Sequence, residues 1–136
     1  METKQAWTGA FDSKNADKFA DAFAEDVVLE AAVLRKPITG RANVALAMGT
    51  ASNLYESVTF THETTSGARS YLEWEAVMPG QPTLHGCTIL VRDEAGKIAK
   101  AIIQHRPLDG LLAFSLTMGE LLAGSDIDPD VFYRKD

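Results

Sequence analysis

Cysteine is scarce in this sequence, with one residue in 136. A single cysteine excludes a disulfide within the chain and any zinc site built from several thiolates. Lysine and arginine form no dense cluster and the formal net charge is −6, so the positive surface that nucleic acid or an anionic membrane requires is missing. No apolar run reaches the ~20 residues of a membrane-spanning helix. We therefore expect no nucleic-acid partner, no membrane partner and a cytoplasmic location.

Motifs for metals and phosphates are also missing. The histidines His62, His85 and His105 lie in separate segments, without a His-x-His or HExxH pattern or an acidic cluster beside them. No glycine-rich turn joins a strand to a helix, as phosphate binding would need. The sequence therefore predicts neither a metal nor a cofactor.

The apolar content is sufficient for one folded domain. Hydrophobic residues make up 46% of the chain and charged residues 24%, which is ordinary for a globular protein. A chain of this length can bury a substantial core, and it shows no repeat or linker. We expect a single domain over residues 1–124, followed by a loosely held acidic tail over 125–136.

Two helices are predicted in the first part of the chain. Residues 1–11 have Ala6, Trp7 and Ala10 spaced to join a core. Asn15 is a good N-cap for a second helix over residues 16–27. Its apolar stripe consists of Ala16, Phe19, Ala20, Phe23, Ala24 and Val27.

The rest of the chain alternates strand and helix signals. A third helix is expected over 42–55, after Gly40, and a last one begins at Pro107. The apolar stripe of that last helix consists of Leu108, Leu111, Leu112, Ser115, Met118 and Leu122. Strands are predicted over 27–34, 58–65, 68–78, 82–92 and 97–105.

The predicted order is α-α-β-α-β-β-β-β-α, which indicates an α+β fold. Short turns with glycine join the last three strands, so these strands form an antiparallel meander. Helices must cover one face of the curved sheet. A cone-shaped sheet wrapped around helices leaves a small-molecule pocket at its mouth.

Strand alternation predicts which side chains point into the cone. The opposite rows carry Glu73, Glu75, Lys100 and Gln104, so we assign the other rows to the inside. The opposite assignment, with each row shifted by one residue, is also consistent with the sequence, because apolar residues stand in those rows too. They are Leu84, Leu90, Ile98 and Ile102. The predicted inward rows are Leu72, Trp74, Ala76 and Met78; His85, Cys87, Ile89 and Val91; and Ala99, Ala101, Ile103 and His105.

Three segments carry a resemblance to a known family. They are FAEDVVLEAAVLRKPITGRANVALAM, DEAGKI and RPLDGLLAFSLTMGELL. In order and spacing they resemble the nuclear transport factor 2-like superfamily and its SnoaL-like branch, which includes ketosteroid isomerases, polyketide cyclases, scytalone dehydratase and limonene epoxide hydrolase. The resemblance implies the cone-shaped fold and a homodimer. It does not fix a function, because this fold hosts enzymes, binding subunits and transport adaptors.

The catalytic positions of ketosteroid isomerase do not keep their chemistry here. The resemblance places them near Trp7, Ala31 and Cys87. Tryptophan lacks the acidic hydroxyl of the family's tyrosine, alanine has no proton acceptor, and a thiol is a weak donor. Classical ketosteroid isomerisation is therefore not expected.

His105 and His85 are the candidate catalytic residues. If both point into the cone, a histidine pair can supply a general base and a general acid without a cofactor, as in an isomerase, lyase or cyclase. The alternative for each is a surface or capping histidine. The predicted pocket lining consists of Trp7, Phe23, Ala31, Val33, Met48, Phe60, Trp74, Cys87, Ile89 and Ile103.

Other polar residues have simpler interpretations. Glu30 lies one residue from the family's base position and is expected to be a salt-bridged or exposed strand residue. Cys87 has no activating cation nearby in sequence, so an inert thiol is favoured over a nucleophile. The functional prediction is binding of a small apolar organic molecule, with or without acid–base chemistry. The rival hypothesis is a non-catalytic ligand-binding or scaffolding protein.

A homodimer is predicted through the outer sheet face. The residues Leu84, Leu90, Ile98 and Ile102 would form an apolar surface there that a monomer leaves exposed.

Overall fold

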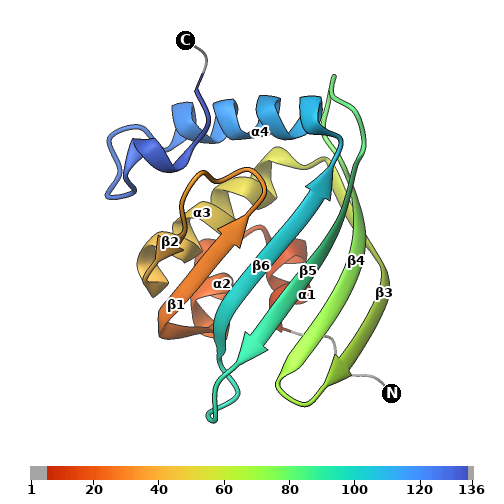
Figure 1. The fold of residues 1–136 in the computed structure, drawn as a ribbon, viewed down its shortest axis with the longest axis vertical. Coiled ribbons are helices and arrows are strands. Elements are labelled where there is room, and N and C mark those ends of the chain that lie inside the picture. Colours follow the sequence, from red (N-terminus) through yellow and green to blue (C-terminus); the bar gives the residue numbers. More distant parts are fainter. Residues whose placement is uncertain (1–5, 135–136) are drawn as a thin grey trace.

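The computed structural model describes residues 6–134, in which four α-helices pack against a six-stranded sheet (Figure 1). Residues 1–5 of the predicted first helix lie outside this range. The helices are α1 (Ala6–Ser13), α2 (Ala16–Ala22), α3 (Arg41–Leu54) and α4 (Leu108–Leu121). The strands are β1 (Phe23–Ala31), β2 (Ile38–Thr39), β3 (Ser57–Ser66), β4 (Arg69–Val77), β5 (Leu84–Arg92) and β6 (Ile98–Arg106), and a short 3₁₀ helix η1 (Pro129–Val131) follows α4.

The sheet has the order β2-β1-β6-β5-β4-β3. Strands β4 to β6 form the antiparallel meander that the sequence predicted, and β3 extends it by one strand. Strand β1 pairs in parallel with β6, which brings the first strand of the chain beside the last. The predicted α+β fold is confirmed.

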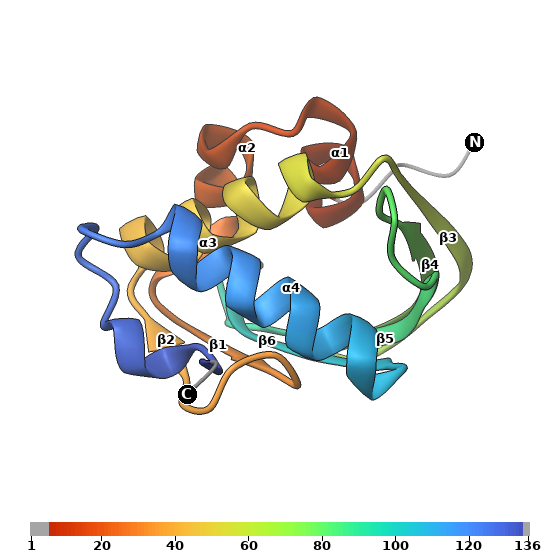
Figure 2. The ribbon, with the colours of Figure 1, turned by 90° about the horizontal axis from the view of Figure 1, so that it is seen from above.

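The helices are placed on one face and at one end of the curved sheet. Seen from above, α1, α2 and α3 cover the concave face, and α4 crosses the end of the cone (Figure 2). The buried side chains of α1, α3 and β1 meet those of β4 to β6 in one core. Within residues 6–134, no helix is long and apolar enough to cross a membrane.

The second helix ends earlier than predicted. We expected a helix over 16–27, but α2 stops at Ala22 and β1 begins at Phe23. Phe23 and Val27 are both buried, so their spacing satisfied the helical pattern even though the backbone is extended. Phe23 pairs with Ile98 of β6, and the register then shifts before Val28. Hydrogen bonds to a strand far along the chain therefore decide the conformation of this segment.

The predicted inward row of β5 is wrong by one residue. Leu84, Thr88 and Leu90 are buried, whereas His85 and Ile89 are only half-buried and belong to the opposite row. The predicted inward rows of β4 and of β6 from Ala101 to His105 are on the concave side. Burying two leucines outweighs burying His85 and Cys87, because apolar area removed from water dominates the choice of face.

The segment after α4 is not a loosely held tail. Ile127, Val131 and Phe132 are buried in the core, and Leu34 forms an antiparallel bridge with Phe132. The predicted stripe of α4 needs a related correction, since Leu108 is 70% exposed and Leu112 46% exposed. Phe132 of this last segment packs against α4 beside Gly119.

Candidate functional site

The concave side of the sheet encloses an apolar cavity of about 40 Å³. Strands β1, β3, β4, β5 and β6 supply one wall, and α1, α3, α4 and the C-terminal segment supply the other. Among the described residues that form this wall there is no Asp, Glu, Lys or Arg. Aromatic rings make up much of it, namely Phe11, Tyr55, Phe60, Trp74, Phe114 and Phe132.

His105 brings an imidazole to this apolar wall. It is the penultimate residue of β6, and its inward direction follows from the alternation that buries Ala101 and Ile103. The Nδ1 atom of His105 is buried and has no hydrogen-bond partner among residues 6–134. Burial lowers the pKa of His105 from 6.5 to about 4. The ring is therefore neutral at physiological pH, with one polar atom unsatisfied.

A glycine and a tryptophan position the ring beside His105. Gly86 lies between Trp74 of β4 and His105 of β6 in the ladder. A side chain at Gly86 would overlap the Trp74 indole, so the indole occupies the space that the glycine leaves. The Nε1 of Trp74 donates to the hydroxyl of Thr88 at 2.9 Å, and the rings of Trp74 and His105 are 5.5 Å apart.

Tyr55 is a second polar residue at the cavity. It follows α3, lies nearly parallel to the ring of Phe114 at 5.4 Å, and is 6.4 Å from the ring of Trp74. Burial raises the pKa of Tyr55 far above its ordinary value of 10, so its hydroxyl stays protonated. Tyr55 and Thr88 are not among the site residues that the sequence predicts. A lone tyrosine at a helix end and a threonine in an apolar strand carry no recognisable motif.

The predicted lining residues fall into three groups. Ala31, Val33, Met48, Phe60, Trp74 and Ile103 lie around the cavity. Trp7 and Phe23 are buried but pack instead into an aromatic cluster with Phe19. Cys87 and Ile89 belong to the outer row of β5, so their predicted place at the cavity is wrong for the same reason of register.

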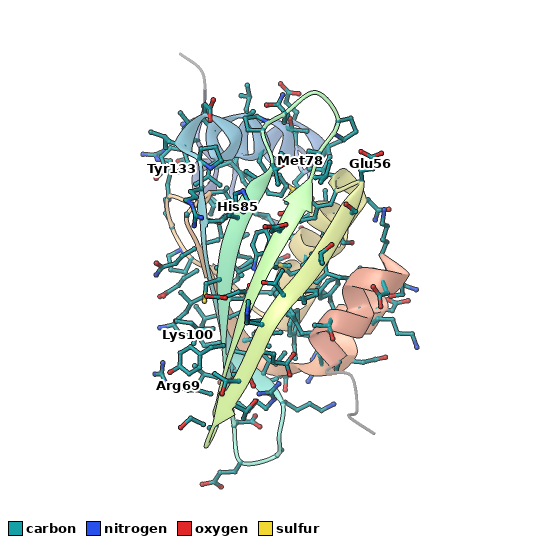
Figure 3. All side chains as sticks on the ribbon, turned by 90° about the vertical axis from the view of Figure 1, so that its right-hand side faces the viewer. Glu56, Arg69, Met78, His85, Lys100 and Tyr133 are labelled. Carbon is teal, nitrogen blue, oxygen red and sulfur yellow. The ribbon has the colours of Figure 1, made fainter. Side chains whose placement is uncertain are left out.

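His85 does not converge with His105. It belongs to the outer row of β5, and its Nδ1 lies 3.4 Å from a carboxylate oxygen of Glu75. Figure 3 shows His85 on the sheet together with Lys100, which projects away from the helices. The two histidines therefore do not share the apolar cavity, although both border a more polar hollow that also has Glu73, Glu75 and Arg106 in its wall, so the predicted acid–base pair stays a prediction.

Cys87 and Glu30 have the simpler roles that the sequence favoured. Burial and the neighbouring carboxylate of Glu73 raise the pKa of Cys87, which disfavours a reactive thiolate. Glu30 forms a half-exposed ion pair with Lys100 at 3.3 Å on the outer face. Among residues 6–134, no three His, Cys, Asp or Glu side chains gather as metal ligands would.

The predicted dimer face also changes. Leu84, Leu90 and Ile98 are buried within the chain, so only Ile102 of the predicted set is on the outer face. The homodimer itself stays a prediction.

Comparison with known families agrees with this architecture. The family model of the SnoaL-like domain matches residues 5–101. This chain belongs to the SnoaL-like domain family. The fold is that of the nuclear transport factor 2-like superfamily, as the resemblance in the sequence predicted. A search of the curated proteins found no match.

Solved structures share the fold of this SnoaL-like domain. A steroid delta-isomerase from Pseudomonas aeruginosa is similar with a TM-score of 0.78 and 25% identity, covering 86% of each chain. An uncharacterised protein with a cystatin-like fold from Silicibacter pomeroyi has a TM-score of 0.79 and 20% identity, covering 85% of this chain and 81% of the other. A ketosteroid isomerase-like protein from Catenulispora acidiphila, in complex with trimethylamine, has a TM-score of 0.62 and 22% identity, covering 79% and 87%.

Proposed function

We propose that this SnoaL-like domain binds a small, neutral, mostly apolar organic molecule in the cavity beside His105. The observation that carries the proposal is the apolar cavity with the His105 ring in its wall, together with the buried Nδ1 of that ring, which has no hydrogen-bond partner within residues 6–134. An unsatisfied buried polar atom costs roughly 1–3 kcal/mol, and a ligand with one polar group can recover part of that cost. Ions are disfavoured because the wall offers no compensating charge.

The size of the cavity restricts the ligand. Pockets for drug-sized molecules usually measure about 300–1,000 Å³, far more than the about 40 Å³ found here. The similarity to a steroid delta-isomerase therefore does not make a steroid the proposed ligand. A single six-membered ring with one polar substituent is the starting probe, and the wall has to widen to hold it, because an apolar cavity that takes benzene measures about 150 Å³.

Three probes of equal heavy-atom count test the proposal. Phenol is neutral with a polar hydroxyl, toluene is neutral without one, and cyclohexylammonium is charged. We expect the protein to bind phenol about tenfold more tightly than toluene, which is roughly the value of one hydrogen bond, and to reject the ammonium ion. Isothermal titration calorimetry measures the three affinities at pH 7.

The matched variants are His105→Ala and His85→Ala. The preference for phenol over toluene should disappear in His105→Ala, because the polar partner is gone. It should persist in His85→Ala, because that side chain is on the outer face. Binding of none of the probes, or an unchanged preference in His105→Ala, would contradict the proposal.

Cofactor-free proton transfer at the same site is the second candidate. It is supported by a neutral imidazole and a protonated Tyr55 hydroxyl at one apolar cavity, and by the likeness to a steroid delta-isomerase. In this chemistry His105 accepts a proton from carbon while Tyr55 donates a hydrogen bond to the developing oxyanion.

Deuterium exchange next to the carbonyl of cyclohexanone, followed by NMR in D₂O, measures the proton transfer directly. Catalysis by His105 predicts exchange above the buffer rate that falls at least a hundredfold in His105→Ala. Exchange no faster than in buffer would leave the domain as a binding protein.

A further inference from the structure

Three segments far apart in the sequence close one side of the cavity. The connection between β1 and β2 contributes Val33 and Leu34, α4 contributes Phe114 and Met118, and the C-terminal segment contributes Phe132. The first of these is a turn, and the last runs from the end of the short 3₁₀ helix η1 into irregular chain, so neither is part of a ladder. We call residues 33–35 and 131–133 together the cover.

One buried hydroxyl joins both halves of the cover to the same helix. Ser115 of α4 is fully buried. Its Oγ donates a hydrogen bond to the carbonyl oxygen of Val33 at 2.6 Å. The same Oγ accepts a hydrogen bond from the N–H of Tyr133 at 2.9 Å. At 0% exposure, this side chain satisfies a backbone hydrogen-bonding group of each of the two chain segments. We call this arrangement the clasp.

The two halves of the cover are also bonded to each other. Leu34 and Phe132 form an antiparallel bridge, and the N–H of Arg35 donates to the carbonyl oxygen of Val131 at 2.7 Å. An ion pair between Lys36 and Asp128 at 3.4 Å lies beside them, but both side chains are more than half exposed, so it adds little. The halves are therefore expected to move together.

The cover is the part of the cavity wall that no β-ladder holds. Strands β3 to β6 are nine or ten residues long and pair along their length with local register shifts, whereas the two halves of the cover share a single isolated bridge. Regions with few backbone hydrogen bonds open locally far more often than ladders do. A molecule that enters the apolar cavity from the end of the cone has to pass apolar side chains, and the cover is the part of that end without a ladder.

We infer that the cover is a gate, clasped shut by Ser115, that parts to admit a ligand to the apolar cavity beside His105. The ligand in this inference rests on the proposed function, whereas the clasp and the opening do not. Ser115 has a positioning role, because its hydroxyl proton is already donated to Val33 and its oxygen accepts from Tyr133.

The first test needs no ligand. The amide of Arg35 donates to Val131 and makes no bond to Ser115, so its hydrogen exchange reports on the separation of the two halves of the cover. In Ser115→Ala we expect exchange at Arg35 to be about tenfold faster, with the amides of β4 and β5 unchanged. Thr117→Ala is the matched control, because Thr117 is an exposed hydroxyl on the same helix that bonds only within it, to Ala113.

The second test measures passage through the gate. Phenol binding is followed by stopped-flow fluorescence, since Trp74 lines the cavity. In Ser115→Ala we expect both the association and the dissociation rate to rise by several-fold, with the dissociation constant changed less than threefold. Thr117→Ala should keep the native rates.

The outcomes separate the two claims. Unchanged exchange at Arg35 in Ser115→Ala would overturn the clasp. Faster exchange with unchanged phenol rates would overturn the cover as the entry route. If phenol does not bind at all, the proposed function fails, and exchange at Arg35 still decides whether Ser115 holds the two halves together.

Discussion

His105 shows how one residue can be placed correctly while its expected partner is not. Alternation along β6 predicted an inward side chain at His105, and the structure has it at the cavity. The same reasoning failed for His85, because β5 offered two rows of similar apolarity. Leu84 and Leu90 settled the choice by their burial. The site therefore has a single histidine, with Tyr55 and Thr88 as its polar neighbours at the wall.

The lowered pKa of His105 predicts a specific dependence of stability on pH. Above pH 6.5 His105 is neutral in both the folded and unfolded states. Between pH 6.5 and about 4 only the unfolded state gains the proton, so the free energy of unfolding falls as the pH falls. The loss is about 2 kcal/mol at pH 5 and levels off below pH 4. Urea unfolding of the native chain at several pH values measures it.

The control variants isolate the contribution of His105. His105→Gln removes the titrating group, so its stability should fall less steeply between pH 6.5 and 4. His62→Gln removes an exposed imidazole of the outer face that lies 3.0 Å from Glu73, and it is the matched control for the loss of a histidine. An identical slope in the native chain and in His105→Gln would refute the prediction.

At the scale of elements, strand β5 was predicted in position but not in register. Its ends at Leu84 and Arg92 are close to the expected ones, since glycine and proline mark the flanking turns. Its inner row, however, includes Gly86 and Thr88, which no hydrophobic pattern selects. That row is explained by Trp74, whose indole needs the space over Gly86 and the hydroxyl of Thr88. The burial of Leu84 and Leu90 and the contacts with Trp74 on the neighbouring strand together decide the register.

Gly86→Ala tests this packing. The added methyl would overlap the Trp74 indole, so we expect a loss of roughly 1–3 kcal/mol in unfolding free energy and a changed fluorescence of Trp74. Gly9→Ala is the matched control, because nothing lies within 4 Å of an added Cβ there and Gly9 is inside α1. It should stabilise the protein by about 0.5–1 kcal/mol. Equal stability changes in the two variants would contradict the packing argument.

At the scale of the whole molecule, the outer sheet face is the feature with consequences for assembly. Ile102 of β6 pairs with Ile89 of β5, and Ile89 pairs with Tyr71 of β4. All three are half-buried on the face that turns away from the helices. This short apolar row replaces the set of leucines that we had expected on that face.

We predict a homodimer through this row. A charge at its centre should separate the subunits, because an unpaired carboxylate in an apolar interface is costly. Light scattering coupled to size-exclusion chromatography should find a dimer for the native chain and a monomer for Ile102→Glu. Leu112→Glu, at an exposed position on α4, should remain a dimer. A monomeric native chain, or dissociation caused by Leu112→Glu alone, would show that the prediction is wrong.

The sequence by itself determined the order of most elements, the α+β class and the family, because these depend on local periodicity, turn residues and composition. It also placed His105 inward. The tertiary structure alone decided where α2 ends, which row of β5 faces the cavity, and that Phe132 packs over α4. Each of these depends on a partner distant in the sequence: β6 for Phe23, Trp74 for Gly86, and Leu34 for Phe132. Where two conformations or two rows of one segment are similarly apolar, only the distant residues that pack against the segment decide which is adopted.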